Sequence, residues 1–316
     1  MRPVHEPHKN RIHLGIVGFG KIARDQHVPA IESNPTFELA GIASPQGGLT
    51  GVTSRESLAA LLDAVPALQA VALCTPPQSR YEIALLALSH GLHVMLEKPP
   101  CTTLGEAHAL VDIARRQNVA LFASWHSRFA PAVEPARAWA ASHPLQAVRI
   151  RWKENVRVWH PGQTWIWQAG GLGVFDPGIN ALSMLTRILN EPVALRNALL
   201  EIPSNCETPI AAHLQLQSAR GVTIDVDLDF LHVGPQQWDI ELHSDTGSCL
   251  LSMGGSRMLE NGKQVDLPPP DEYPALYARF AHLVGERAID SDLAPLSLVA
   301  DAFLRGQRVE VEPFVE

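Results

Sequence analysis

The chain has 316 residues, with 46% hydrophobic and 18% charged, which is ordinary for a globular enzyme of two domains. Its formal net charge of −8 gives no basic footprint for nucleic acid, and no apolar run reaches membrane-spanning length. The four cysteines form no C-x-x-C pair, so neither a disulfide framework nor a thiolate zinc site is indicated. The first ten residues lack the apolar core of a signal peptide, which predicts a cytoplasmic protein.

A glycine turn follows the first predicted strand, Ile12–Val17, which comes after a leader (1–11) that we expect to be disordered. The turn has the pattern G-x-G-x-x-A and opens a helical stretch over 22–33, an arrangement typical of dinucleotide binding. Free amides at the helix start favour phosphates. A turn shaped only by packing is the alternative. The residues expected at the cofactor here are Gly18, Gly20, Lys21 and Ile22.

The second predicted strand, Phe37–Ala43, ends where the adenosine ribose is expected. Ser44 and Pro45 follow it, so neither an acid that would repel a 2′-phosphate nor an arginine that would attract one stands there. The choice between NAD and NADP stays open, and Ser44 suits either. We expect Ser54 to cap the next helix, which runs to about Ala64.

Further strands over 70–75, 93–96 and 119–124 alternate with helical patterns over 78–89 and 104–117. This βαβ alternation predicts an α/β Rossmann domain over 12–128 with a doubly wound parallel sheet. The strands end in polar or proline-rich turns on one edge, the expected cofactor crevice. The residues assigned to the cofactor from these turns are Thr75, Pro76, Glu97, Lys98 and His126.

Lys98 stands at the carboxyl end of the strand over 93–96, followed by two prolines. A lysine in this place points into the crevice where open α/β sheets bind ligands, so we assign it the proton handling of the reaction. The alternative is a surface charge at a strand end. For Glu97 beside it, holding the turn is the alternative to a contact with the cofactor.

From residue 129 the pattern changes to short alternating strands, which predict an α+β domain over 129–316 with a mostly antiparallel, open-faced sheet. The strands are expected over 146–154, 195–203, 210–217, 222–230, 238–243 and 309–311, and helices over 131–141, 179–189, 274–285 and 295–306. The last helices can pack back on the first domain. Asp225, Asp227 and Asp229 form a stripe that we interpret as a solvated strand face, so no metal is predicted.

Four of the seven tryptophans fall between Trp152 and Trp167. Indole rings stack on the C–H faces of sugars when exposed and belong to a core or a dimer contact when buried. The strand alternation places Trp152 in the core, and both alternatives stay open for Trp159 and Trp165. The residues proposed for sugar hydroxyls are Glu154, His126 and His160, and a plain surface histidine is an equal alternative for His160.

A glycine-rich segment, 170–173, leads to Asp176 and Asn180, which lie four residues apart. If both stand in the first turns of a helix they share one face, and the glycines permit close approach of a ligand. An N-cap role for Asp176 is an equally good interpretation.

Taken together, the glycine turn, Glu97-Lys98-Pro99 and the segment from Gly170 to Asn180 resemble the glucose–fructose oxidoreductase and inositol dehydrogenase family, over nearly the whole chain from Ile12. Longer motifs resemble its L-arabinose and D-galactose 1-dehydrogenase members. The resemblance implies NAD(P)-dependent oxidation of an aldose at C1 to its lactone, and a homodimer formed through the open sheet.

The resemblance also implies individual roles. Lys98 and Asp176 match the family's lysine and aspartate at the reacting carbon, and Asn180 stands where many members have histidine, so we expect it to position a hydroxyl. Lys98 accepts the proton itself, or orients the hydroxyl while Asp176 accepts it. In the subgroup an arginine follows the serine that matches Ser44; here Pro45 replaces it, which weakens the inference of NADP. A sugar or nucleotide sensor without turnover, and an oxidoreductase for another polyol, are the alternative functions.

Overall fold

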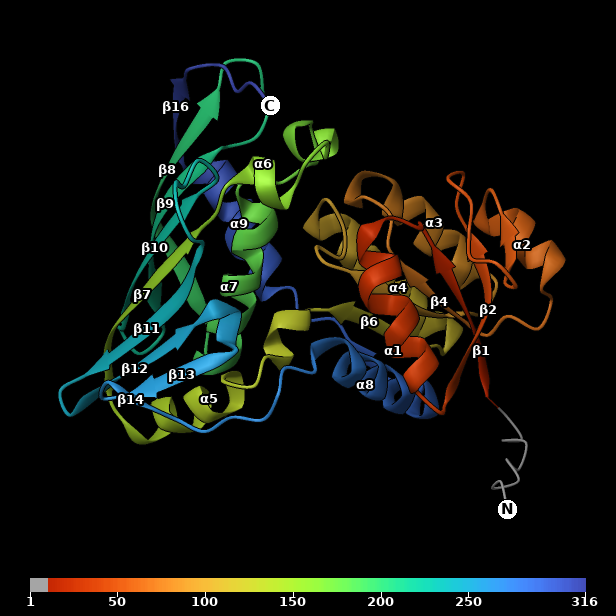
Figure 1. Cartoon of the computed structure of the whole chain (residues 1–316), viewed down its shortest axis with the longest axis horizontal. Coiled ribbons are helices and arrows are strands. Elements are labelled where there is room, and N and C mark those ends of the chain that lie inside the picture. The colour runs from red at the N-terminus through yellow and green to blue at the C-terminus, as the bar shows by residue number, and fades with distance from the viewer. Residues whose placement is uncertain (1–10) are drawn as a thin grey trace. The chain divides into compact units, whose positions relative to one another are not determined.

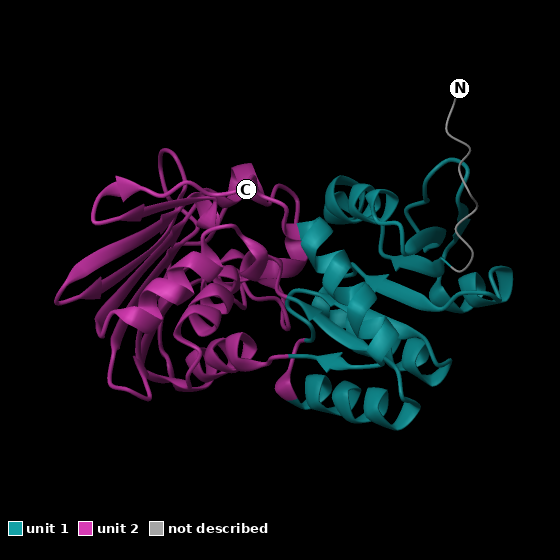
Figure 2. Cartoon of the chain, turned by 90° about the horizontal axis from the view of Figure 1, so that it is seen from below, with its two compact units in different colours: residues 1–101, 105–124, 273–291 teal, residues 102–104, 125–272, 292–316 magenta. Residues whose placement is uncertain are grey.

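The chain divides into two compact units (Figure 2) in a computed structural model that describes residues 11–316. Apart from Arg11, the predicted leader lies outside the described residues. Unit 1 takes the chain up to residue 101, then 105–124 and 273–291. Unit 2 takes 102–104, 125–272 and 292–316. The sequence places the domain boundary after residue 128, and the main segment of unit 2 begins at residue 125.

Unit 1 is built on a parallel sheet whose strand order reverses between β1 and β4, as in a dinucleotide-binding fold. Across the sheet the strands are β15 (Ile289–Asp290), β6 (Leu121–Ser124), β5 (His93–Glu97), β4 (Ala70–Leu73), β1 (Ile12–Val17), β2 (Phe37–Ala43) and β3 (Thr53–Arg55). The predicted α/β Rossmann fold is confirmed. In open sheets of this kind, ligands bind at the carboxyl ends of the strands where the order reverses.

Helices cover both faces of this sheet. Their bounds are η1 (Ala23–His27, a π-helical turn), α1 (Val28–Ser33), α2 (Leu58–Ala64), α3 (Pro77–Ser89), α4 (Leu104–Gln117) and α8 (Glu272–Glu286). Although α8 comes late in the sequence, it packs on unit 1: Phe280 stacks against Phe37 and Phe122, and all three rings are buried. Burying each such side chain contributes about 1.5–3 kcal/mol, so this contact anchors α8 to the sheet.

The cap of α2 differs from the expectation. Ser57 is the N-cap: its backbone is extended and its hydroxyl accepts a hydrogen bond from the amide of Ala60. Ser54 instead lies in the short strand β3, which the sequence analysis did not predict, and its hydroxyl donates to the carbonyl of Val52. A three-residue strand carries too little alternation to be recognised from sequence.

Unit 2 is built on a mostly antiparallel sheet of nine strands (Figure 1), which confirms the second predicted sheet. In order they are β14 (Lys263–Gln264), β13 (Arg257–Glu260), β12 (Gly247–Ser252), β11 (Gln237–Ser244), β7 (Leu145–Lys153), β10 (Thr223–Asp229), β9 (Ala211–Ser218), β8 (Val193–Pro203) and β16 (Gln307–Val311). Two pairs are parallel, β7 with β10 and β8 with β16. The strands β12–β14 were not predicted, because they are short and their turns are close together.

One face of this second sheet is covered by helices. These are α5 (Val133–Ser142), α7 (Phe175–Leu189) and α9 (Ala294–Arg305), and Figure 1 shows α7 and α9 along the sheet. The inward side chains of β7, Trp152 among them, are buried, while Arg149 and Arg151 on the same strand point outward. The other face of the sheet is therefore open and charged.

The aspartate stripe of β10 lies on this open face. Asp225 is 3.4 Å from the ring of His213, Asp227 pairs with Lys153, and Asp229 accepts a hydrogen bond from the amide of Leu231. Within residues 11–316, no group of three or more His, Cys, Asp or Glu side chains is arranged to hold a metal ion.

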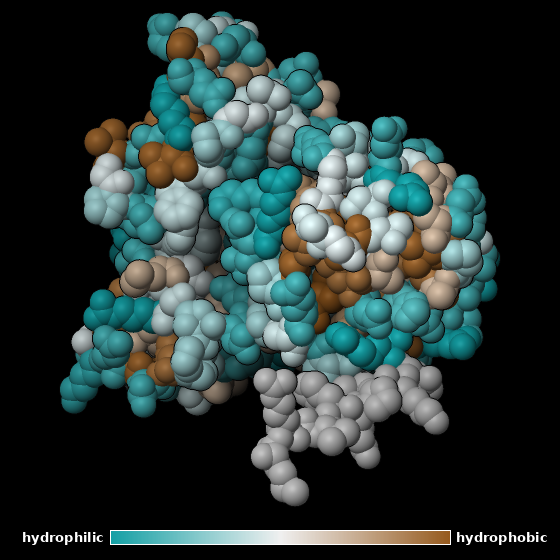
Figure 3. All heavy atoms as spheres, turned by 45° about the vertical axis from the view of Figure 1, so that its right-hand side comes forward, coloured by the Kyte–Doolittle hydropathy of each residue, from teal (hydrophilic) through white to brown (hydrophobic). Residues whose placement is uncertain are grey.

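The surface that Figure 3 presents is mostly hydrophilic, with hydrophobic side chains in separate groups. In unit 2 the exposed hydrophobic side chains include Val158 and Trp159 of α6 (Val156–Trp159), and Leu231 and Val233 of the loop after β10. A bridge between Asn155 and Leu231 joins the two segments. Over the described part of the chain, none of the helices has the length and apolarity needed to cross a membrane.

Candidate active site

The glycine turn lies where the strand order of unit 1 reverses. Gly18 has φ +87°, and a Cβ there would stand 2.8 Å from the amide nitrogen of Thr75, so only glycine fits. Its own amide donates to the carbonyl of Ala43 at 2.8 Å. A Cβ on Gly20 would meet nothing within 4 Å, which leaves room for a pyrophosphate against the backbone. The turn therefore fits a dinucleotide.

The next residues open the helical segment. Lys21 and Ile22 are exposed, and Lys21 forms an ion pair with Asp25 one turn on. Thr75 is half-buried and Pro76 exposed at the end of β4, beside Gly18. All the residues that the sequence assigns to the cofactor in unit 1 lie at or after the carboxyl ends of its strands.

At the end of β2, where the ribose is expected, Ser44 lies beside a residue that the sequence analysis did not single out. Ser44 is buried, and its hydroxyl accepts from the amide of Gln46 at 3.2 Å. Its amide donates to the carbonyl of Arg55 on β3 at 2.8 Å. Arg55 is exposed, so an arginine does adjoin the end of β2, from a neighbouring strand and not from the position after Ser44.

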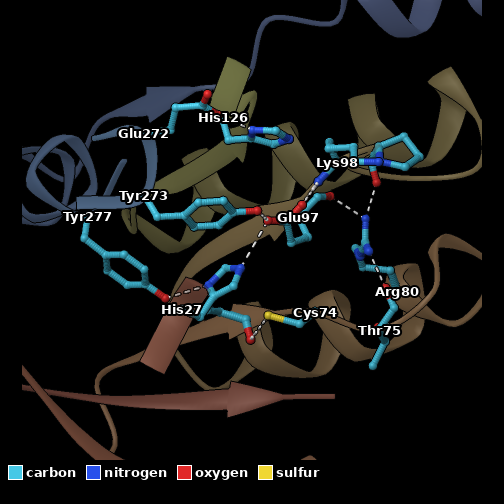
Figure 4. A network of polar contacts seen from close by, with 12 residues as sticks. His27, Cys74, Thr75, Arg80, Glu97, Lys98, His126, Glu272, Tyr273 and Tyr277 are labelled. Atoms are coloured by element: carbon cyan, nitrogen blue, oxygen red, sulfur yellow. Dashed lines mark hydrogen bonds and ion pairs between the residues drawn. The ribbon is translucent and has the colours of Figure 1, made fainter. Parts of the chain in front are cut away.

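The turn that carries Lys98 is held by buried groups (Figure 4). The peptide bond from Lys98 to Pro99 is cis. Glu97 is 4% exposed, and its carboxylate accepts from the amide of Lys98 at 2.7 Å. Arg80 of α3, also buried, donates to the carbonyls of Glu97, Pro99 and Thr75. Lys98 itself is half-buried, and the backbone that presents it is thus fixed from two sides.

Glu97 is bound on its other oxygen by two side chains. The hydroxyl of Tyr273 donates to it at 2.8 Å, and Nε2 of His27 lies 3.1 Å away. The Nδ1 atom of His27 is 2.8 Å from the hydroxyl of Tyr277. The assignment of Glu97 to the cofactor stays a prediction, and the structure places its carboxylate in the interior of unit 1.

Burial and neighbours act on the histidine in opposite directions. Burial lowers the pKa of His27, whereas Cys74, Tyr277 and Glu97 raise it, and its net pKa lies well above 6.5. Burial raises the pKa of Tyr277 to about 12, so its hydroxyl keeps its proton at neutral pH. That hydroxyl can accept from a charged imidazole or donate to a neutral one, and either form of His27 keeps a proton on Nε2 for Glu97.

Unit 2 contains a second polar cluster, formed by Glu154, His160 and Asp176, which the sequence analysis had singled out. Glu154 follows β7, is 2% exposed and accepts from Nε1 of Trp238 at 2.8 Å. Nε2 of His160 lies 2.8 Å from the same carboxylate, and its Nδ1 lies 3.8 Å from Asp176. His160 is therefore set between two carboxylates and is not a plain surface residue. Trp238, the first residue of a predicted strand, was not among the residues singled out from the sequence.

Asp176 lies in the first turn of α7 and is 3% exposed. It is not the N-cap: Val174 holds that position, without a side-chain cap. Asn180 follows one turn later on the same face and is partly exposed. Two glycines of the preceding segment have no room for a side chain, because a Cβ would stand 2.4 Å from the carbonyl oxygen of Trp165 at Gly171 and 2.2 Å from that of Pro209 at Gly173.

The remaining predicted residues lie in unit 2. Trp159 is 43% exposed, and its ring packs edge-on against Trp238 at 4.7 Å, next to Glu154. Trp165 is half-buried in η3 (Thr164–Trp167). His126, in η2 (His126–Phe129), is 2.6 Å from Glu272 through its Nδ1. Their roles toward a ligand stay predictions.

Known proteins with similar sequences are consistent with this fold. Residues 12–124 match the model of an oxidoreductase family with an NAD-binding Rossmann fold. Galactose 1-dehydrogenase of Pseudomonas fluorescens is 45% identical over 305 residues, which are 96% of this chain and 99% of that protein.

Solved structures agree. The crystal structure of D-galactose-1-dehydrogenase from Rhizobium etli superposes with a TM-score of 0.93 and 49% identity, covering 98% of this chain and 100% of that one. A 3-ketoreductase from Actinomadura kijaniata, solved with NADP, has a TM-score of 0.86 at 20% identity, with 96% and 100% covered, and shares the fold.

Proposed function

The chain belongs to the glucose–fructose oxidoreductase and inositol dehydrogenase family, and from this premise we propose that it is an NAD(P)-dependent aldose 1-dehydrogenase. Its proposed reaction oxidises C1 of a cyclic sugar, L-arabinose or D-galactose, to the aldonolactone. The observation that carries the proposal is the similarity to galactose 1-dehydrogenases over nearly the full length of the chain. The buried polar cluster of unit 2 supports it, because a ligand rich in hydroxyls needs such partners to replace water.

In unit 1 the glycine turn and the first residues of the helix would hold the pyrophosphate through backbone amides. The turns after β4, β5 and β6 would line the nicotinamide half, with Thr75, Pro76, Glu97 and His126 as the contributing residues. A nicotinamide bound there would supply the hydride acceptor for C1.

Proton transfer is assigned to Lys98. In its neutral amine form it accepts the proton of the C1 hydroxyl, and Asp176 acts as its partner by pairing with the ammonium that results. Asn180 carries no acid or base and positions a hydroxyl by hydrogen bonding. The support is local to each unit: the backbone of Lys98 is fixed by Glu97 and Arg80, and Asp176 is buried in the first turn of α7.

The other hydroxyls of the sugar are assigned to Glu154, His160 and His126, and its C–H face to Trp159 and Trp165. An indole exposed beside a buried carboxylate, as Trp159 is, suits a ring with one apolar face and several hydroxyls.

For the cofactor we propose NADP over NAD. The support is Arg55, an exposed arginine whose carbonyl accepts the amide of Ser44 at the end of β2. A guanidinium there would pair with a 2′-phosphate, and no acid stands after the strand to bind a free 2′-hydroxyl. We further propose a cytoplasmic homodimer formed through the open sheet of unit 2.

The test is the rate of nicotinamide reduction, followed by near-ultraviolet absorbance, with a panel of aldoses and both cofactors. We expect turnover with D-galactose and L-arabinose, and a lactone that hydrolyses to the aldonic acid. Sugar binding without turnover would contradict the proposal and indicate a sensor. Turnover only with polyols that are not aldoses would show that the proposed substrate class is wrong.

A further inference from the structure

His27 is a fully buried histidine that the proposed reaction does not use. It lies in η1, the helical turn that follows the glycine turn, and both its ring nitrogens are engaged. Nε2 is 3.1 Å from Oε1 of Glu97, and Nδ1 is 2.8 Å from the hydroxyl of Tyr277 (Figure 4). This buried imidazole therefore contacts the carboxylate that lies next to the proposed catalytic lysine.

The carboxylate of Glu97 links three parts of unit 1. Oε1 accepts from Tyr273 of α8 and faces His27, while Oε2 accepts the backbone amide of Lys98 at 2.7 Å. Hydrogen bonds to a buried carboxylate are shorter and stronger than those between neutral groups. Two partners on Oε1 therefore fix the plane of the carboxylate, and with it the direction of Oε2.

We propose that His27 is a positioning residue of the reaction, which fixes the backbone of Lys98 through the carboxylate of Glu97. The inference rests on the proposed role of Lys98. Tyr273 of α8 also donates to this carboxylate, and Arg80 binds the carbonyls of the same turn. The contact between Nε2 and Glu97 exists in both protonation states of His27, because the hydroxyl of Tyr277 can accept from a charged imidazole at Nδ1 or donate to a neutral one.

Two substitutions of His27 separate this role from simple packing. The side-chain amide of glutamine reaches the place of Nε2 and can still donate to Glu97, whereas that of asparagine reaches only the place of Nδ1, on the Tyr277 side. We expect His27→Asn to lower kcat about tenfold, the effect of losing one hydrogen bond to a charged group, with little change in KM for sugar or cofactor. His27→Gln should keep kcat within roughly threefold of wild type.

The two tyrosines provide a matched pair of hydroxyl deletions. Tyr273→Phe removes the second donor to Glu97, and Tyr277→Phe removes the partner of Nδ1, which does not touch Glu97. Both keep the buried ring. We expect Tyr273→Phe to lower kcat several-fold and Tyr277→Phe to leave it within about twofold. Because it changes so little volume, Tyr273→Phe also carries the test if His27→Asn does not fold.

Amide hydrogen exchange gives a readout that needs no substrate. Pro99 and Pro100 have no amide, so a peptide over 97–101 reports mainly on Lys98 and Cys101. Loss of the fixed carboxylate should speed exchange in this peptide roughly fivefold in His27→Asn and Tyr273→Phe, but not in His27→Gln or Tyr277→Phe.

The two proposals fail in different ways. If wild type oxidises no aldose, the proposed function fails. The exchange pattern still tests whether His27 fixes the backbone of Lys98. Equal exchange and equal kcat across the four folded variants, or losses of kcat that merely follow losses of Tm, would overturn the role of His27.

Discussion

Lys98 and Asp176 stand in different settings. The side chain of Lys98 leaves a turn whose carbonyls are bound by Arg80 and whose amide is bound by Glu97. Asp176 is buried at the start of α7, where the helix dipole favours a carboxylate, with His160 at 3.8 Å. The surroundings fix the backbone of Lys98 and bury the carboxylate of Asp176. The proposed proton transfer requires that both groups hold defined positions.

Removal of the amine tests its proposed role. Lys98→Ala should lower kcat about a hundredfold to ten-thousandfold, because a general base contributes roughly 10²–10⁴-fold, while the glycine turn keeps the cofactor Kd within a few-fold. Steady-state kinetics and fluorescence titration of the reduced cofactor measure the two effects. Near-normal turnover in this variant would refute the assignment.

The proposed preference for NADP rests on one exposed side chain, that of Arg55. Arg55→Ala should raise KM for NADP⁺ about tenfold and leave KM for NAD⁺ within about twofold, because one charge-assisted contact to a phosphate is lost. Arg24→Ala is a suitable control, since that exposed arginine stacks on Phe19. Equal changes for both cofactors would show that Arg55 does not meet the 2′-phosphate.

His93 makes stability depend on pH in a defined direction. Its Nδ1 accepts the amide of Ala120 at 2.9 Å, and burial, then the charge of Arg287, lowers its pKa below 6.5. The contribution of a group with a depressed pKa is complete above the unfolded value and is lost as pH falls through the folded value. Wild type should therefore lose Tm on acidification below about pH 6.5.

The matched variant for this effect is His93→Asn, whose side-chain oxygen can accept the same amide without titrating. Its Tm should fall less than that of wild type between pH 7.5 and 5.5 by calorimetry. Parallel curves for the two proteins would exclude His93 as the titrating group.

Among the elements, the segment from Asn155 to Gln168 is held at several points by the residues after β16. The ring of Phe314 lies 4.7 Å from the guanidinium of Arg157 and 4.8 Å from the ring of Trp167. Asn205 binds both the amide and the carbonyl of Phe314. This segment carries His160, so the late residues of the chain support the proposed sugar-binding cluster from outside it.

Phe314→Ala should loosen this segment. We expect KM for the sugar to rise about fivefold to tenfold, because ordering the segment then costs binding free energy, with kcat and KM for the cofactor little changed. Val315→Ala is the control: its side chain is 71% exposed, and only its carbonyl is bound by Arg157. The same KM change in both variants would argue against an effect of the aromatic ring.

At the scale of the whole molecule, the open face of the sheet in unit 2 is the surface through which we propose that the chain dimerises. Its outward side chains form charged pairs, such as Arg151 with Glu241 at 3.0 Å and Lys153 with Asp227. Burial, then Glu241, raises the pKa of Asp239 on the same face. A dimer through such a face would be polar, and its affinity would depend on salt.

Light scattering should give about twice the 34.4-kDa chain mass at micromolar concentration. Arg149→Glu places a carboxylate next to Asp225 and opposite Glu241 in the sheet, and should raise the dimer Kd at least about tenfold. Arg116→Glu on α4 of unit 1 is the control and should leave the mass unchanged. A monomeric wild type, or a dimer insensitive to Arg149→Glu, would contradict the proposal.

Sequence alone determined most of the elements and their classes. Period-two alternation marked the strands of unit 2, and the glycine turn and the strand-helix alternation marked the Rossmann sheet, because these signals depend on neighbours a few residues apart. It also singled out Glu154, His160 and Asp176, by unusual composition and by turn position. Short strands such as β3 and β14 have too few residues to show this alternation.

Only the tertiary structure decided which of these residues meet. His27 reaches Glu97 across 70 positions and Tyr277 across 250, and no local pattern encodes such pairs. Arg55 comes beside Ser44 through a strand that the alternation did not reveal. Buried polar groups must find partners when the chain folds, and the identity of those partners follows from the packing of α8 and the sheets, not from the order of residues along the chain.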